Sequence, residues 1–159
     1  MEEFRLKILD VFLSSKIKNY EQIEYEGKSR KDSCAYFTNG FCSRINIKEN
    51  IVTIWRSENK INPHPVLCFI CPFFSIRNEN LYSITDLLEI YSYYEKIKNN
   101  IVKEIEYIES RLNEFMYNSS SLKRRKEELM YFLNEIEDKL NVTLILIKLS
   151  IKQDNNGNI

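Results

Sequence analysis

The stretches CAYFTNGFC (residues 34–42) and HPVLCFIC (residues 64–71) contain all four cysteines of this 159-residue chain. The first pair is spaced C-x7-C and the second C-x2-C, with 25 residues between the pairs. Two cysteine pairs separated by a longer segment are typical of a structural zinc site, because each pair holds the ion locally. We therefore expect one Zn²⁺ to be bound by Cys34, Cys42, Cys68 and Cys71.

The C-x2-C pair is the stronger of the two signals, since this spacing lets two sulfurs point at one ion. The first pair is wider, but it contains the turn dipeptide Asn39-Gly40. We expect this turn to reverse the chain and return Cys42 beside Cys34.

Other interpretations of the cysteines stay open. Two disulfides would require an oxidising compartment, and four buried thiols could serve as small apolar side chains. A catalytic thiol would need a base, and the only histidine is His64, which lies between two prolines. His64 could also replace one cysteine as a metal ligand. A 4Fe-4S cluster is the alternative cofactor, because four cysteines suit it as well as zinc.

The segment CAYFTNGFC also resembles the opening of a CCCH zinc finger, a family in which aromatic residues between the first two cysteines stack on RNA bases. The resemblance covers nine residues, and the third cysteine and the histidine of that family do not follow at its spacing. It implies possible stacking by Tyr36, Phe37 and Phe41, and Trp55 is a further possible platform. The alternative is that these rings pack around the metal or in the core.

Composition gives looser bounds. The chain has 23 basic and 23 acidic residues, so no overall field attracts a nucleic acid. No apolar run reaches the roughly 18 to 20 residues needed to span a bilayer. The N-terminus MEEFRLK is acidic at once and does not resemble a secretory signal. We therefore expect a cytoplasmic protein without a membrane segment.

The N-terminal half predicts a small α+β module of the zinc-ribbon or treble-clef type. Residues 3–18 have apolar side chains at helical spacing, which indicates an amphipathic helix. Residues 22–26 predict a short strand and residues 27–32 a basic turn. The alternating segment 44–57 predicts a β-hairpin with its turn at Glu49-Asn50.

The C-terminal half predicts a long antiparallel helical hairpin, or coiled coil. Apolar residues recur at spacings of three and four on both sides of NSSS at residues 118–121. We expect the first helix to be capped by Ser83 or Thr85 and the second by one of the serines. The segment 142–151 is rich in β-branched residues, so a returning strand is its alternative structure.

These patterns divide the chain into a metal-binding module with an N-terminal helix (1–75), a helical hairpin (76–152) and a disordered tail (153–159). Several apolar residues of the hairpin lie off its seam, which predicts a homodimer or a fixed contact with a partner. A four-cysteine module with a helical hairpin resembles, in architecture alone, bacterial regulators that enter the RNA polymerase channel. Those regulators have acidic hairpin tips, whereas this tip is basic.

Basic residues are clustered in two places, and this clustering is the main sequence evidence on partners. We expect contacts with DNA, RNA or a nucleoprotein machine from Lys28, Arg30, Lys31, Lys123, Arg124, Arg125 and Lys126. The alternative is solvation and pairing within a helix, for example Arg124 with Glu128.

The resulting hypothesis is a small metal-stabilised binding or regulatory protein. Its alternatives are a protein-interaction scaffold with a structural metal and an iron–sulfur protein. We expect no enzyme, since the sequence has neither a phosphate-binding glycine loop nor a second histidine.

Overall fold

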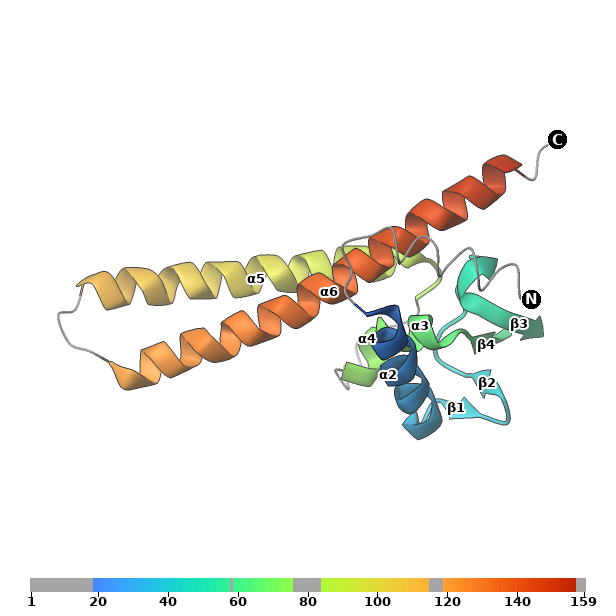
Figure 1. The fold of residues 1–159 in the computed structure, drawn as a ribbon, viewed down its shortest axis with the longest axis horizontal. Helices are drawn as coiled ribbons and strands as arrows, with labels where there is room; N and C mark the ends of the chain where they lie inside the picture. The colour runs from blue at the N-terminus through green and yellow to red at the C-terminus, as the bar shows by residue number, and fades with distance from the viewer. Residues whose placement is uncertain (1–18, 58, 76–83, 115–118, 157–159) are drawn as a thin grey trace.

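The computed structural model describes residues 19–57, 59–75, 84–114 and 119–156. Two long helices, α5 (Leu87–Glu114) and α6 (Ser120–Asn156), form a hairpin that extends away from a small antiparallel sheet and several short helices (Figure 1). The expected mixed α+β class and the helical hairpin are confirmed. The amphipathic helix expected at residues 3–18 lies outside the described residues.

Helix α2 (Tyr20–Ser33) replaces the strand and the basic turn that the sequence predicted for residues 22–32, so that prediction was wrong. Its buried residues are Tyr20, Ile23, Gly27 and Lys31, which recur at spacings of three and four. This is a helical stripe. Two of its four members are glycine and lysine, however, so an apolar pattern could not reveal it.

Strands β1 (Phe37–Thr38) and β2 (Phe41–Cys42) are joined by Asn39 and Gly40, as expected. Both turn residues have positive φ, at 53° and 83°. A two-residue turn of this kind matches the twist of the flanking strands, and Asn-Gly is its preferred sequence. The turn pairs Phe37 with Cys42 and so returns the second cysteine toward the first.

The sheet has the order β1-β2-β4-β3, in which β3 (Thr53–Ser57) and β4 (Lys60–Pro63) form an antiparallel hairpin. The β-hairpin predicted with its turn at Glu49-Asn50 was wrong. A 3₁₀ turn, η1 (Asn50–Val52), stands there instead and buries both Ile51 and Val52. A strand sends successive side chains to opposite faces, so two adjacent buried residues suit a helical turn better.

Two short helices carry the second cysteine pair. Helix α3 (Pro65–Phe69) has Pro65 in its first turn and His64 at its N-cap, and α4 (Pro72–Ser75) follows after Cys71. Helix α2 packs closely on α3 at Gly27. A Cβ atom added to Gly27 would lie 2.0 Å from the carbonyl oxygen of Pro65. Only glycine therefore allows this approach of the two backbones.

The caps of the hairpin helices differ in part from the expectation. The carboxylate of Asp86 accepts from the backbone N–H of Glu89 at 2.9 Å, so Asp86 rather than Thr85 caps α5, and Ser83 lies outside the described residues. The hydroxyl of Ser119 accepts from the backbone N–H of Leu122 at 3.4 Å at the start of α6.

Helix α6 runs without interruption to Asn156. The strand considered for 142–151 is therefore wrong, and residues 153–156 are helical where we expected a disordered tail. Tertiary burial of Val142, Leu146 and Leu149 outweighs the weak helix preference of the β-branched residues around them.

Apolar seams and ion pairs join α5 to α6. Ile101 and Ile108 of α5 and Leu129 and Ile136 of α6 are buried along the hairpin. Ion pairs between the helices lie along the same stretch of the hairpin: Lys98 with Glu137 at 2.8 Å, Arg125 with Glu104 at 3.0 Å and Lys126 with Glu109 at 2.7 Å.

Among the described residues, none of the helices has the length and apolar character needed to cross a membrane.

The core is continuous between the sheet and the hairpin base. One buried cluster includes Ile47, Ile61, Ile70, Ile90 and Leu146, which come from both halves of the chain. The hairpin base thus packs against the cysteine-bearing segments.

We predict that Gly27→Ala lowers the free energy of unfolding by about 1–3 kcal/mol, the range for overpacking a core. The physical reason is the clash with the Pro65 carbonyl, because an open helical position would instead gain about 0.5–1 kcal/mol from alanine. Chemical denaturation measures the difference, with Lys28→Ala on the exposed side of α2 as the control. A neutral or stabilising Gly27→Ala would mean that α2 does not pack on α3 at this point.

Candidate metal centre

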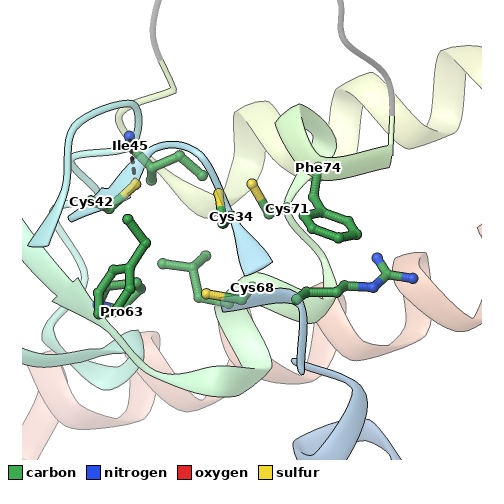
Figure 2. Close-up of a pocket in the computed structure, with 10 residues that line it drawn as sticks. Cys34, Cys42, Ile45, Pro63, Cys68, Cys71 and Phe74 are labelled. Atoms are coloured by element: carbon green, nitrogen blue, oxygen red, sulfur yellow. Dashed lines mark hydrogen bonds between the residues drawn. The ribbon is translucent and has the colours of Figure 1, made fainter. Parts of the chain in front are cut away.

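All four cysteines line one pocket, although they come from four places in the fold (Figure 2). Cys34 is the C-cap of α2, Cys42 ends β2, Cys68 lies in α3 and Cys71 stands between α3 and α4. All four are free thiols. The other lining residues are mostly apolar: Phe37, Ile45, Pro63, Leu67, Phe74 and the side chain of Arg30.

The cavity between these residues has a volume of about 20 Å³. This is room for a single water-sized occupant, since one water needs roughly 10–15 Å³ by the same measure. An organic substrate does not fit. Within the described residues, no three His, Cys, Asp or Glu side chains have the arrangement of a metal site.

Backbone N–H groups point at two of the sulfurs in the same local pattern. The Sγ of Cys42 accepts from the N–H of Arg44 at 3.5 Å and of Ile45 at 3.4 Å. Cys71 accepts likewise from Phe73 and Phe74, the second and third residues after it. Hydrogen bonds of this kind favour the thiolate over the thiol, and the thiolate is the form that binds metals.

Burial shifts the pKa of a thiol in the opposite direction. It raises the pKa of the Cys71 thiol to about 12, while the N–H groups of Phe73 and Phe74 lower it. Burial also raises the pKa of Cys68, and the neighbouring Cys71 adds to that shift. The thiols of Cys68 and Cys71 thus stay protonated unless a cation compensates the negative charge of their thiolates, and a coordinating metal does this directly.

Two cations of α2 border the cysteines instead of lying on an exposed turn. Lys31 is 8% exposed, and its Nζ donates to Asn62 Oδ1 at 2.6 Å and to the Pro63 carbonyl at 2.8 Å. Burial lowers the pKa of this ammonium, and nearby Cys68 raises it. Of the three basic residues predicted to form one exposed contact surface, Lys28 is exposed, Arg30 is partly buried and Lys31 is buried.

The backbone carbonyls of Phe69 and Ile70, which lie between Cys68 and Cys71, each accept a hydrogen bond from a side chain distant in the sequence. Arg30 Nη1 donates to the Phe69 carbonyl at 2.9 Å, and its guanidinium lies 5.4 Å from the centre of the Phe69 ring. The hydroxyl of Tyr94, on α5, donates to the Ile70 carbonyl at 3.0 Å. Tyr94 is fully buried. The hairpin is therefore attached directly to the loop between two cysteines.

A second layer supports this attachment from α6. The fully buried Lys139 has its Nζ 5.6 Å from the centre of the Tyr94 ring and 2.7 Å from Glu135 Oε1. Glu135 in turn lies 3.9 Å from Arg30. Side chains of α2, α5 and α6 thus all contribute to the position of the loop between Cys68 and Cys71, the cysteine loop. Sequence reasoning missed the roles of Arg30, Tyr94 and Lys139.

His64 has a structural role. Its Nδ1 accepts from the backbone N–H of Val66 at 3.3 Å, which caps α3. The backbone N–H of His64 donates to the Val52 carbonyl at 2.8 Å. The histidine is buried and is not among the residues that line the cysteine pocket.

The residues considered for stacking are separated by the fold. Phe37 lines the cysteine pocket, with the Lys31 ammonium 4.7 Å from its ring centre. Tyr36 is 39% exposed and Trp55 is 51% exposed. The rings of Phe41 and Trp55 meet edge to face at 4.6 Å.

The four tip cations lie in the first turns of α6, and the side chains of Arg124, Arg125 and Lys126 form ion pairs within the hairpin. Arg124 pairs with Glu128, Arg125 with Glu104 and Lys126 with Glu109, so the pairing considered as the alternative is present. The backbone N–H of Lys123 donates to the carbonyl of Ser119.

No family model, curated protein or solved structure matches this chain.

We predict that Tyr94→Phe destabilises the protein by about 1–3 kcal/mol, the cost of leaving a buried acceptor unsatisfied. The substitution removes one hydroxyl and leaves the Ile70 carbonyl without its donor. Thermal or urea unfolding measures the loss, and Tyr107→Phe on an exposed part of α5 is the matched control. Equal stability of the two variants would show that the Tyr94 hydroxyl contributes nothing to holding the cysteine loop.

Proposed function

We propose that this chain is a zinc-stabilised binding protein, in which a four-cysteine centre holds the small α+β part and supports the helical hairpin as a projecting binding element. The observation that carries the proposal is the convergence of four cysteines, from separate elements, on one pocket. Cysteines distributed at random would not meet in this way. A cytoplasmic location is consistent with four free thiols.

The pocket supports a single ion better than a cluster. Its volume of about 20 Å³ suits one ion, whereas a 4Fe-4S cluster would need the lining residues to move apart. The paired N–H groups on Cys42 and Cys71 and the cations at Arg30 and Lys31 favour a centre of four thiolates. Closed four-cysteine centres are structural, since catalytic zinc keeps one position open for water. We therefore propose a stabilising rather than a catalytic metal.

Protein purified without a metal-affinity step is predicted to contain about one zinc per chain. Removal of zinc with a chelator, or Cys68→Ser, should unfold the cysteine-bearing part first, because metal binding contributes directly to folding. Elemental analysis and circular dichroism measure the two effects. Several irons per chain and a brown colour would instead support the iron–sulfur alternative. A metal-free protein that is fully folded would contradict both.

His64→Asn separates the two possible ligand sets. Asparagine is a favoured N-cap, so this variant keeps the cap of α3 while removing the imidazole. Zinc content should stay at the wild-type level in His64→Asn and fall in each of the four cysteine variants. Loss of zinc in His64→Asn with α3 intact would make His64 a ligand.

A second candidate function is contact with DNA, RNA or a nucleoprotein complex through the tip of the hairpin. The specific observation is that four consecutive cations occupy the start of α6, where the helix dipole favours negative charge. Helix stability alone does not explain this placement. The ion pairs to Glu104, Glu109 and Glu128 are partly exposed. Exposed pairs contribute only about 0–1 kcal/mol each, so phosphates could replace the glutamates.

Replacement of Lys123, Arg124, Arg125 and Lys126 by glutamine is predicted to leave the protein folded and to weaken nucleic-acid binding in a salt-dependent way. The matched control replaces four other exposed cations of the hairpin, Lys96, Lys103, Lys148 and Lys152. Fluorescence anisotropy with labelled DNA and RNA, at two salt concentrations, measures the affinities. Equal affinities of both variants would exclude a specific role of the tip.

That outcome would favour the remaining alternative, an interaction scaffold. The hairpin exposes Tyr107, Met130 and Tyr131, each at least half exposed. These side chains would then be the contact with a protein partner or with a second copy of the chain.

A further inference from the structure

The sheet presents an aromatic surface on the side of Trp55. Strands β2 and β3 both pair with β4, and the rings of Phe41 and Trp55 meet across β4 at a centroid distance of 4.6 Å. Trp55 stands opposite Asn62, and 51% of its surface is exposed. Two adjacent rings, one of them half exposed, form an apolar surface of the kind that marks binding sites. We call Phe41, Trp55 and Lys60 the aromatic face.

Strand alternation places Lys60 on this face. Lys60 lies two residues before Asn62 in β4. Residues two apart in a strand point to the same side.

The charge of this region identifies the kind of partner. Residues 34–63 contain four basic and two acidic residues, whereas residues 84–156 contain 11 basic and 13 acidic residues. One of the two acidic residues, Glu49, accepts from the N–H of Leu87 and is thereby committed to the start of α5. Lys48, Arg56 and Lys60 are exposed. An anionic partner is therefore attracted to the sheet and not to the shaft of the hairpin.

We propose that the aromatic face binds single-stranded nucleic acid, with bases stacked on Trp55 and Phe41 and a phosphate held by Lys60. Flat exposed rings beside cations are the two elements that bind unpaired strands, since every base has a face to stack and every linkage carries a charge. A duplex keeps its bases stacked on one another and offers them no access. The proposal rests on the proposed function in one respect: Cys42 follows Phe41 directly, so the metal centre supports this strand.

The single tryptophan makes the test direct, because all tryptophan emission comes from Trp55. Titration with a 12-nucleotide oligo(dT) or oligo(rU) should quench this emission in a saturable, salt-sensitive way. The same sequence in duplex form should quench weakly, and heparin, which has charge but no bases, should not quench. The dT and rU arms distinguish DNA from RNA as the preferred strand.

Variants test the contribution of stacking by anisotropy with the labelled oligonucleotides. Trp55→Ala should weaken binding about tenfold or more, because stacking contributes about 1–3 kcal/mol per base. Trp55→Phe keeps a ring and should retain most of the affinity, and Tyr131→Ala removes a more exposed ring from α6 as the control. Zinc content, measured on every variant, distinguishes a failure of this proposal from a failure of the metal centre.

Two results would overturn the proposal. The first is equal affinity of Trp55→Ala and the wild type for single strands while both contain zinc. The second is a blue-shifted Trp55 emission that depends on protein concentration and not on added oligonucleotide, which would assign the aromatic face to a second copy of this chain. Affinity for single strands, measured by anisotropy, that Trp55→Phe retains and Trp55→Ala loses supports it.

Discussion

The close packing of α2 on α3 at Gly27 is the contact on which the rest of the cysteine region depends. Because Gly27 has no side chain, the two backbones approach to a distance that a Cβ would forbid. Arg30, one turn later, then reaches the Phe69 carbonyl, and Cys34, at the end of the helix, reaches the pocket of Cys68 and Cys71. The absence of a side chain at Gly27 thus determines where Cys34 lies.

The parts of the fold that sequence predicts well are those in which one signal is long or chemically specific. The helical hairpin was predictable because its apolar period continues over two helices of 28 and 37 residues. The Asn39-Gly40 turn was predictable because few dipeptides accept two positive φ angles. Helix α2 was not, since Gly27 and Lys31 occupy buried positions that an apolar pattern leaves out.

The same distinction applies to the candidate site. The spacing of the cysteines predicted that they would meet, because metal-binding pairs have a recognisable pattern. The residues that hold the cysteine loop act on backbone carbonyls, at Phe69 and Ile70. Any donor of the right length could do this, so Arg30 and Tyr94 carry no signature in the sequence. Their contacts span 39 and 24 residues along the chain and become visible only in the folded structure.

The buried ammonium of Lys31 connects the electrostatics of the site with the proposed metal. Its hydrogen-bond acceptors, Asn62 Oδ1 and the Pro63 carbonyl, are both neutral. Burial of an ammonium is unfavourable unless an opposite charge compensates it, and Cys68 and Asp32 are the neighbours that raise the pKa of Lys31 and favour its charged form. Four thiolates around one Zn²⁺ carry a net negative charge, which would add to this compensation. In the proposed zinc-bound protein, Lys31 and the cysteines therefore stabilise each other.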